Sequence, residues 1–366
     1  MKATTGYRLR ATGQNKSALS RALLLLLAAV LAGCSSPPQD GVTVLTYASP
    51  YAPTHPFSRA DIAWMAWLER ESGGKLRVQP YWSASLLSSE NAMTELRHGV
   101  ADVGLITPIY ARGGAHLIRA QAGFYGGAVT FAQQVGMYRC LVAAEPQFDR
   151  ELAGLKILAV QGGNLPVIIT RNRAVRTLAE LKGMRLRAPS ELIEVLEDFG
   201  ADPVDMPMRD VYPALAKGVL DGVVAPMDTF KSLHFAEVAS YVNTIVIPRG
   251  AYAARAMNER RWRELTPQQQ ALLEAATPIW EQALERELTV ANTEGTRAAH
   301  DGGVAFSDMP AADQAQFDAI YARDGEHRAR GLTRFGIDGT KTFQLARRIA
   351  AGMTATNGAP PCEERQ

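Results

Sequence analysis

Histidine, cysteine and serine most often carry covalent or metal chemistry, and in this chain they are not arranged for it. No two histidines have the His-x-x-x-His spacing of a zinc-binding helix, and no serine lies in a Gly-x-Ser-x-Gly turn. Cys140 and Cys362 are far apart without a neighbouring histidine, so they predict neither a nucleophile nor a metal site. Paired carboxylates stay open, with Asp228 as the candidate. The sequence therefore favours no enzyme, metal or cofactor. The histidines are His55, His98, His116, His234, His300 and His327.

Cys34 is a thiol whose position does predict a reaction. A basic leader precedes an apolar run over 22–30 that is too short to span a bilayer. The following Leu31-Ala32-Gly33-Cys34 resembles a bacterial lipobox, in which the cysteine is acylated and becomes the new N-terminus. We expect a signal peptide over 1–33 and a lipidated, flexible tether over 34–40. An ordinary signal peptide that contains a cysteine is the alternative, and Ser35 leaves the choice of inner or outer membrane open.

The charge of the chain depends on that leader. The 366-residue sequence has a formal charge of +2, and the five basic residues of 1–33, with no acidic residue among them, bring the remainder to −3. No later stretch combines clustered Lys and Arg with aromatic residues, so a nucleic-acid partner is not expected. Cys140 and Cys362 lie in an oxidising compartment that allows a disulfide without requiring one.

One seven-residue pattern, Leu-x-x-Gly-Val-x-Asp, occurs twice, at 96–102 and at 215–221. Each copy follows a helix-like segment, 89–98 or 208–217, and precedes a short apolar run. A glycine that ends a helix takes the left-handed conformation, and the apolar run after it is typical of a buried strand. A candidate strand also precedes each helix, at 74–78 and at 183–187. The duplication predicts two similar α/β lobes.

The remaining pattern assigns segments to these lobes. We expect lobe I from 41–158 with about 253–275, and lobe II from 159–252 with the C-terminal segments. A long helix should begin after Thr266 and Pro267, run to about 299 and brace both lobes, because threonine caps helices and proline favours the first turn. The tail over 355–366 is expected to be loose.

The chain resembles, over nearly its whole mature length, the solute-binding subunit of tripartite ATP-independent periplasmic (TRAP) transporters, the DctP-like family. Each matching stretch is weak alone, but their order and spacing together are specific. The resemblance implies a two-lobed periplasmic binding protein of the type II-like, Venus-flytrap kind that delivers a small organic anion to a sodium-driven permease. The matching stretches are 73–78, 95–102, 181–189, 200–203, 211–222 and 257–258, with Trp262, Leu265 and Pro267.

The resemblance also implies a ligand clamp. In that family an arginine after Leu-Lys-Gly binds the ligand carboxylate, and the matching residue is Arg187. A guanidinium suits this role because its planar fork of donors fits a carboxylate and stays charged. The alternative is that Arg187 pairs with Glu191 or Glu194. Arg185 is interpreted as a solvated or salt-bridged strand residue.

The sequence departs from the family pattern at two positions. Ala225 stands where relatives commonly have a donating asparagine, and Val167 lies near the place of a second arginine. The resemblance therefore implies a less polar pocket and favours a monocarboxylate with an apolar or aromatic body, including 2-oxo acids, because unpaired buried groups are costly. Loops at the ends of strands supply the other pocket candidates. These are Tyr47, His55, Thr107 and Tyr110 from lobe I and Met227, Asp228 and Phe230 from lobe II.

The expected partners are a small organic carboxylate, the small and large TRAP membrane subunits, and a membrane through the lipid on Cys34. A sensor lipoprotein of the same fold that is not dedicated to transport is the first alternative. A hydrolytic enzyme is the second.

Overall fold

The structure is a computed structural model that describes residues 41–355 and residue 362. The described residues from Thr43 onward belong to one compact unit, and only Gly41 and Val42 of the unit before it are described. The expectations for Cys34, the signal peptide and the tether lie outside the described residues, as does most of the tail over 355–366. Among the described residues, no helix is long and apolar enough to cross a membrane.

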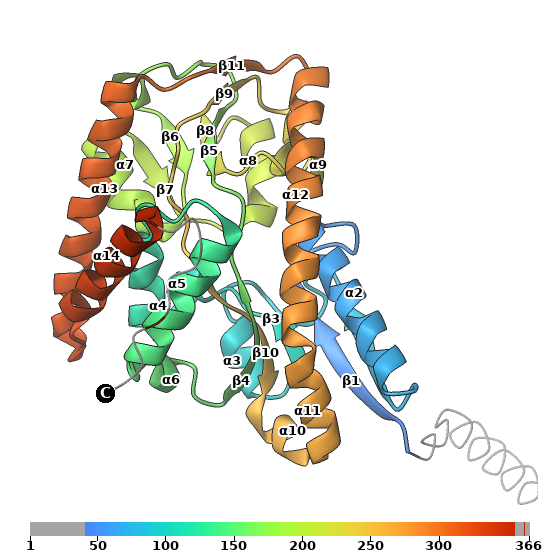
Figure 1. Ribbon diagram of the computed structural model, residues 1–366. Helices are drawn as coiled ribbons and strands as arrows, with labels where there is room; N and C mark the ends of the chain where they lie inside the picture. The colour runs from blue at the N-terminus through green and yellow to red at the C-terminus, as the bar shows by residue number, and fades with distance from the viewer. Residues whose placement is uncertain (1–40, 356–361, 363–366) are drawn as a thin grey trace, which may run out of the picture. The chain divides into compact units, whose positions relative to one another are not determined.

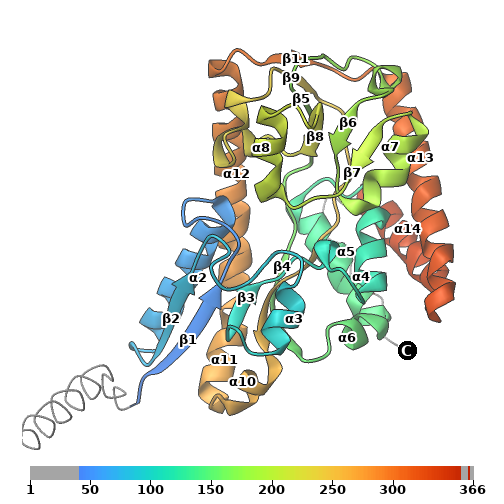
Figure 2. The same ribbon diagram turned by 180° about the vertical axis from the view of Figure 1, so that it is seen from behind.

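Lobe I is built on a sheet with the strand order β2-β1-β3-β10-β4. The first three strands, labelled in Figure 2, run parallel. Strand β10 lies antiparallel between β3 and β4. Alternation in β1 sends Leu45 and Tyr47 into the core and leaves Val44 about half exposed. The strands are β1 (Thr43–Ala48), β2 (Leu76–Tyr81), β3 (Val103–Leu105), β4 (Leu155–Gln161) and β10 (Tyr252–Asn258).

Lobe II is built on a sheet with the strand order β11-β9-β5-β8-β6-β7. Strand β6 runs parallel to β7 and β8, whereas β5 runs antiparallel to β8 and β9. The two faces of this sheet pack against separate apolar cores. The strands are β5 (Val167–Thr170), β6 (Arg185–Arg187), β7 (Asp202–Val204), β8 (Gly222–Ala225), β9 (Tyr241–Asn243) and β11 (Ala305–Ser307).

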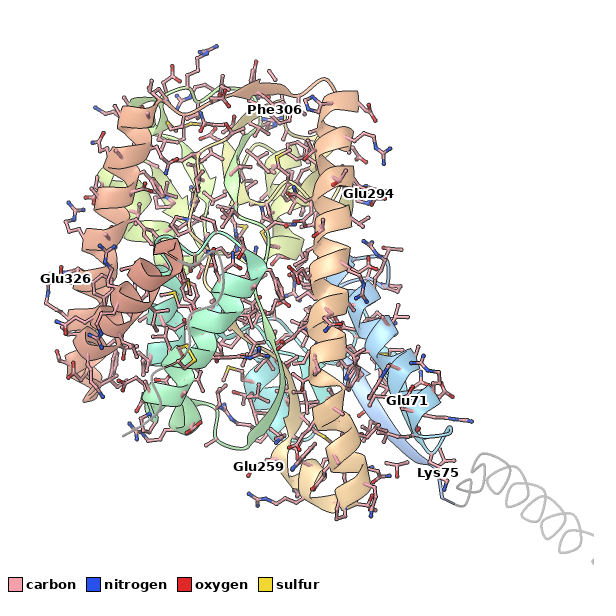
Figure 3. All side chains as sticks on the ribbon, viewed as in Figure 1. Glu71, Lys75, Glu259, Glu294, Phe306 and Glu326 are labelled. Carbon is pink, nitrogen blue, oxygen red and sulfur yellow. A yellow bond between two sulfur atoms is a disulfide. The ribbon has the colours of Figure 1, made fainter. Side chains whose placement is uncertain are left out.

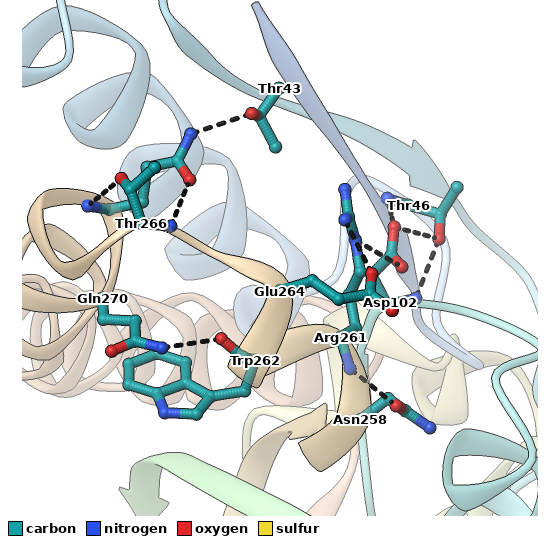
Figure 4. Close-up of polar contacts among 10 residues, drawn as sticks. Thr43, Thr46, Asp102, Asn258, Arg261, Trp262, Glu264, Thr266 and Gln270 are labelled. Atoms are coloured by element: carbon teal, nitrogen blue, oxygen red, sulfur yellow. Dashed lines mark hydrogen bonds and ion pairs between the residues drawn. The ribbon is translucent and has the colours of Figure 1, made fainter.

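The repeated pattern has the same local structure in both lobes, which confirms the predicted duplication. It ends α3 (Ala92–Arg97) and α8 (Val211–Ala216), with its glycine at φ +80° in Gly99 and +70° in Gly218. Its aspartate binds a backbone N–H of the neighbouring strand, since Asp102 Oδ2 accepts from Thr46 N at 2.8 Å and Asp221 Oδ2 from Arg185 N at 2.7 Å. Figure 4 shows the Asp102 network.

The expected helix over about 267–299 is two helices, α11 (Pro267–Ala275) and α12 (Thr277–Asp301). Thr266 caps α11 as expected. A second proline, Pro278, explains the division, because it has no N–H to donate and its ring clashes with the carbonyl of the residue four positions earlier.

Helix α12 runs along both lobes (Figure 1), packing on α2 (Pro56–Glu71) and β4 in lobe I and on α9 (Thr229–Ser232) in lobe II. Glu287 of α12 pairs with Arg59 of lobe I at 2.5 Å. Glu294 of α12, labelled in Figure 3, pairs with Lys231 of lobe II at 3.0 Å.

The C-terminal helices do not belong to lobe II alone. Helix α13 (Ala311–Gly331) contacts α7 (Ile193–Asp198) in lobe II and α4 (His116–Gln121) in lobe I, and α14 (Gly339–Ala355) packs on α5 (Phe131–Ala144) in lobe I. The earlier assignment of these segments to lobe II is therefore wrong for α14, whose Phe343 and Met353 enter the lobe I core. Cys140 on α5 forms a disulfide with Cys362. The remaining elements are α6 (Gln147–Glu151), α10 (Glu259–Glu264) and the 3₁₀ turns Pro108–Tyr110, Ala122–Phe124, Leu178–Leu181, Ser190–Leu192, Met208–Asp210, Phe235–Glu237 and Leu332–Phe335.

Candidate functional site

A cavity of about 100 Å³ is lined by residues of both lobes. This space holds several water-sized groups, so it suits a small organic molecule. The cavity lies where strands of both sheets end, because parallel strands bring their carboxyl ends to one edge. The chain also crosses between the lobes at this place, at 162–166 and 244–251. Polar and aromatic lining residues are Tyr51, His55, Phe57, Thr107, Tyr110, Arg187, Glu191, Asp228, Arg249 and Tyr252. Aliphatic lining residues include Pro166, Val224, Pro248 and Leu288.

Arg187, the last residue of β6, is 3% exposed and held by three acceptors. Its Nε donates to Met206 O at 2.9 Å, its Nη1 to Val224 O at 3.4 Å and its Nη2 to the Tyr110 hydroxyl at 2.6 Å. A guanidinium has one N–H on Nε and two on each terminal nitrogen, so each terminal nitrogen keeps one donor. Among the described residues no carboxylate lies within 4.0 Å of Arg187, so the alternative ion pair with Glu191 or Glu194 is not formed. These donors remain available to an anion in the cavity.

Tyr110 joins Arg187 to the opposite lobe. Its 3₁₀ turn, Pro108–Tyr110, follows β3 of lobe I, whereas Arg187 lies in lobe II. Burial raises the pKa of the Tyr110 phenol above its usual value, although the Arg187 charge opposes this shift. The hydroxyl accepts from Arg187 and stays protonated, so its own hydrogen can be donated to a carboxylate at the same fork.

Aromatic rings form one wall of the cavity. The His55 ring stacks on Tyr51 with 4.0 Å between centroids and meets Phe57 edge-on at 4.7 Å. His55 Nδ1 accepts from Phe57 N at 3.2 Å and so caps α2, which places the proton of the neutral ring on Nε2. Burial foremost, and then the charges of Arg59 and Arg255, lower the pKa of His55 to about 3. The wall therefore stays uncharged at neutral pH.

Two carboxyl groups also line the cavity. Glu191 is 8% exposed, and its Oε2 has no hydrogen-bond partner among the described residues. Asp228 is 5% exposed and accepts from Asn164 Nδ2 at 3.1 Å. Burial is the largest cause that raises the pKa of each carboxyl, while Arg328 and Arg187 oppose the shift at Glu191 and Asn164 and Arg249 oppose it at Asp228. These acids make the cavity unfavourable for a highly charged anion.

Arg249 is a second guanidinium in the cavity wall. It lies on the crossing from β9 to β10, and its Nη1 donates to the carbonyl of Asn164 at 3.5 Å on the other crossing. Among the described residues, no group of three His, Cys, Asp or Glu residues is placed to hold a metal ion. The arrangement of donors, acceptors and rings is that of a binding site for a small acid.

Comparison with known proteins shows the family of the chain. The model of the family described as "Bacterial extracellular solute-binding protein, family 7" (DctP) matches residues 48–326. The chain belongs to this family. The resemblance inferred from the sequence motifs is therefore confirmed, together with its two-lobed α/β fold.

Relatives of this family 7 protein match it at low sequence identity. A solute-binding protein of Albidiferax ferrireducens is 26% identical over 181 residues, which cover 48% of this chain and 52% of that protein. The chain thus spans about half the length of this curated relative.

Two solved structures match at 21% identity. A TRAP solute-binding protein of Rhodoferax ferrireducens with copurified benzoate has a TM-score of 0.77, covering 87% of this chain and 100% of that chain. A marine metagenome TRAP protein specific for aromatic acid ligands, with metahydroxyphenylacetate, has a TM-score of 0.74, covering 85% and 99%.

The structure of this family 7 protein brings five of the expected pocket residues together. His55, Thr107, Tyr110, Arg187 and Asp228 line the cavity. The other five are not among its lining residues. Tyr47 is in the lobe I core, where its hydroxyl donates to Asp61 at 2.5 Å, and Met227 and Phe230 lie in a lobe II core.

Ala225 and Val167 are paired across β8 and β5 and pack in that same lobe II core. Successive strand residues point to opposite faces, so Val224 lines the cavity and Ala225 faces away. Ala225 therefore does not remove a hydrogen-bond donor from the wall of this cavity.

Arg249, Tyr51 and Tyr252 line the cavity without having been expected from the sequence, and Glu191 was expected only as a possible partner of Arg187. Arg249 stands between Pro248 and Gly250, in a segment without a helix or strand. The proline and glycine on either side of Arg249 are the one sequence signal that could have indicated a crossing segment. Tyr51 precedes His55 in the proline-rich loop and could have been grouped with it.

Proposed function

We propose that this family 7 protein captures a small organic monocarboxylate in the cavity between its lobes. The ligand carboxylate binds the free donors of Arg187 and the Tyr110 hydroxyl. The apolar or aromatic body of the ligand lies against Tyr51, His55 and Phe57. The protein then delivers the ligand to the membrane subunits of a sodium-driven TRAP permease.

The observation that carries this proposal is the partnering of Arg187. A guanidinium that is 3% exposed and without a carboxylate partner is costly unless an anion completes it. Its three acceptors are two backbone carbonyls and one hydroxyl, which orient the fork without neutralising it. This is the arrangement expected of a carboxylate clamp.

The body of the ligand follows from the rest of the wall. Flat rings at Tyr51, His55 and Phe57 suit a flat or branched apolar body, since aromatic pairs favour stacked or edge-on contacts. Glu191 and Asp228 would repel a second carboxylate. The benzoate and metahydroxyphenylacetate held by two proteins of the same fold are both aromatic monocarboxylates.

Attachment and delivery form the second part of the proposal. A lipid on Cys34 would tether the protein outside the cytoplasm, at a membrane where it meets a permease. A sensor of the same fold would bind the same ligand without serving uptake. Loss of ligand uptake in cells lacking this chain, restored by the wild-type gene, supports transport, whereas unchanged uptake contradicts it.

The ligand class is tested by calorimetry and thermal shift on refolded, ligand-free protein. The panel contains aromatic and aliphatic monocarboxylates, 2-oxo acids, C4-dicarboxylates and sugar acids. We expect monocarboxylates to bind most tightly and to stabilise the protein most. Stabilisation by dicarboxylates or sugar acids alone would show that the proposed ligand class is wrong.

A further inference from the structure

A second polar pole of the cavity lies on the side of the two crossing segments. Strand β6, which carries Arg187, is separated from β9, which leads to Arg249, by β8 and β5. Arg187 therefore reaches the cavity from β6, and Arg249 from the crossing that follows β9. Arg187 acts on the pKa of Glu191 and Arg249 on that of Asp228, while both arginines act on the pKa of Tyr110.

Arg249 lies against the crossing that it faces. A Cβ on Gly163 would lie 2.6 Å from Arg249 Cζ, so the guanidinium approaches this glycine closely. The Gly163 backbone is itself held by Gln134, which accepts from its N–H at 2.8 Å and donates to its carbonyl at 3.1 Å. Among the described residues Arg249 makes one hydrogen bond, a long one to Asn164 O, so it keeps donors for a ligand.

Asp228 faces the cavity beside this guanidinium. Asn164 connects the two, since its carbonyl accepts from Arg249 and its Nδ2 donates to Asp228 Oδ1 at 3.1 Å and to Leu288 O at 3.0 Å. Arg249 and Asp228 do not form an ion pair within 4.0 Å in the described structure, although both line the cavity. A donor and an acceptor thus face the same cavity without an ion pair between them.

We propose that Arg249 and Asp228 together bind a hydroxyl group of the ligand, so that the preferred ligand is a hydroxylated aromatic monocarboxylate. This inference rests on the proposed function, because Arg187 holds the carboxylate at the other pole. A hydroxyl accepts from Arg249 and donates to Asp228 at the same time. A second carboxylate can only accept and would be repelled by Asp228, while an unsubstituted ring leaves both groups without a ligand partner.

The test compares matched ligands on the wild-type protein by calorimetry. The probes are benzoate, its 2-, 3- and 4-hydroxy derivatives, the fluoro analogue at each of these positions, and isophthalate. We expect at least one hydroxybenzoate to bind at least tenfold more tightly than both benzoate and its own fluoro analogue. We expect isophthalate to bind more weakly than benzoate. Equal affinities for benzoate and all three hydroxybenzoates would overturn the inference and leave the proposed function intact. Failure of every acid to bind would overturn both.

Variants assign the preference to the two residues. Arg249→Met and, independently, Asp228→Asn should each reduce the ratio of hydroxybenzoate to benzoate affinity at least tenfold. Arg185→Met is the matched control, because Arg185 lies on the exposed side of β6 and should leave the ratio unchanged. Circular dichroism checks the fold of each variant. A ratio that survives both substitutions would overturn the assignment, and the wild-type ligand series decides the inference even where a variant fails to fold.

Discussion

Burial sets the properties of the side chains around the cavity. Burial first, and then the charges of Arg59 and Arg255, lower the pKa of His55, so its ring is neutral at pH 7. Two carbonyls and a hydroxyl orient the fork of Arg187. Both side chains are less than a tenth exposed. A guanidinium is a cation in proteins, so Arg187 and not His55 can pair with an anion.

The first prediction at this scale concerns Arg187. Arg187→Ala should weaken monocarboxylate binding by about 2–5 kcal/mol, because the carboxylate would enter a dry cavity without its charged partner. Titration calorimetry measures the loss. Arg185→Ala is the control, since Arg185 is 53% exposed and 3.7 Å from Asp202. Binding within a few-fold of wild type in a folded Arg187→Ala protein would contradict the clamp.

The second prediction concerns His55 and pH. Its pKa is about 3 in the folded protein against an ordinary 6.5, so between these values the unfolded chain binds a proton that the folded protein does not. Stability must therefore fall as the pH falls, at up to about 1.4 kcal/mol per pH unit for this group. Between pH 7 and pH 5, His55→Asn should lose about 2 kcal/mol less unfolding free energy than wild type. Asparagine can still cap α2.

Denaturant titrations at both pH values measure this difference. His98→Asn serves as the control, because His98 is exposed and its replacement should leave the pH dependence unchanged. If His55→Asn and wild type lose the same free energy, His55 is not held neutral in the fold.

At the scale of elements, α12 positions the second pole of the cavity through a close approach. A Cβ on Gly295 would collide with the carbonyl oxygen of Met227 and would lie 2.7 Å from Asp228 Cα. Glycine therefore allows the helix to touch the loop that carries Asp228. The same helix contributes Leu288 to the cavity wall and its carbonyl to Asn164.

Gly295→Ala should accordingly destabilise the protein by roughly 1–3 kcal/mol, through overpacking against backbone that cannot move away. This reverses the usual effect, since alanine in place of glycine within a helix ordinarily stabilises by roughly 0.5–1 kcal/mol. Gly352→Ala in α14 is the matched control, because a Cβ there meets nothing within 4 Å. Chemical denaturation of both variants checks the prediction, and a stabilised Gly295→Ala protein would refute the close approach.

At the scale of the whole molecule, binding and attachment are assigned to different parts of the chain. The lobes are connected around the cavity by the two crossing segments and by helices α12 and α13. The Cys140–Cys362 disulfide ties residue 362 to α5 in lobe I. The proposed anchor lies at the other end of the chain, at Cys34. A tethered protein of this kind can close on its ligand without involving the membrane.

The prediction at this scale is acylation of Cys34. Labelled palmitate should enter the wild-type protein, and Cys34→Ala should carry none and should leave the membrane fraction. Cys362→Ala is the control that keeps the leader intact. Label in the Cys34→Ala protein would show that the motif is not a lipidation site.

The sequence by itself determined the local units and the family. Gly99 and Gly218 end helices in the left-handed conformation, which follows from the residues next to them. The position of Arg187 in β6 was likewise predictable, because the Leu-Lys-Gly stretch before it is a local pattern. Thr266 caps a helix for the same reason. The expected continuous helix is divided at Pro278, which is also a local signal. The type of each element was therefore predictable from neighbouring residues.

Only the tertiary structure decided which side chains share the cavity. Ala225 and Val224 are neighbours in sequence, yet strand alternation sends their side chains to opposite faces of the sheet. No pattern in the neighbouring residues indicates which of the two faces lines the cavity. Arg249 joins Arg187 because separate crossings and strand ends converge at the edges of two sheets. Convergence of this kind depends on strand order and packing, which a pattern of neighbouring residues does not contain.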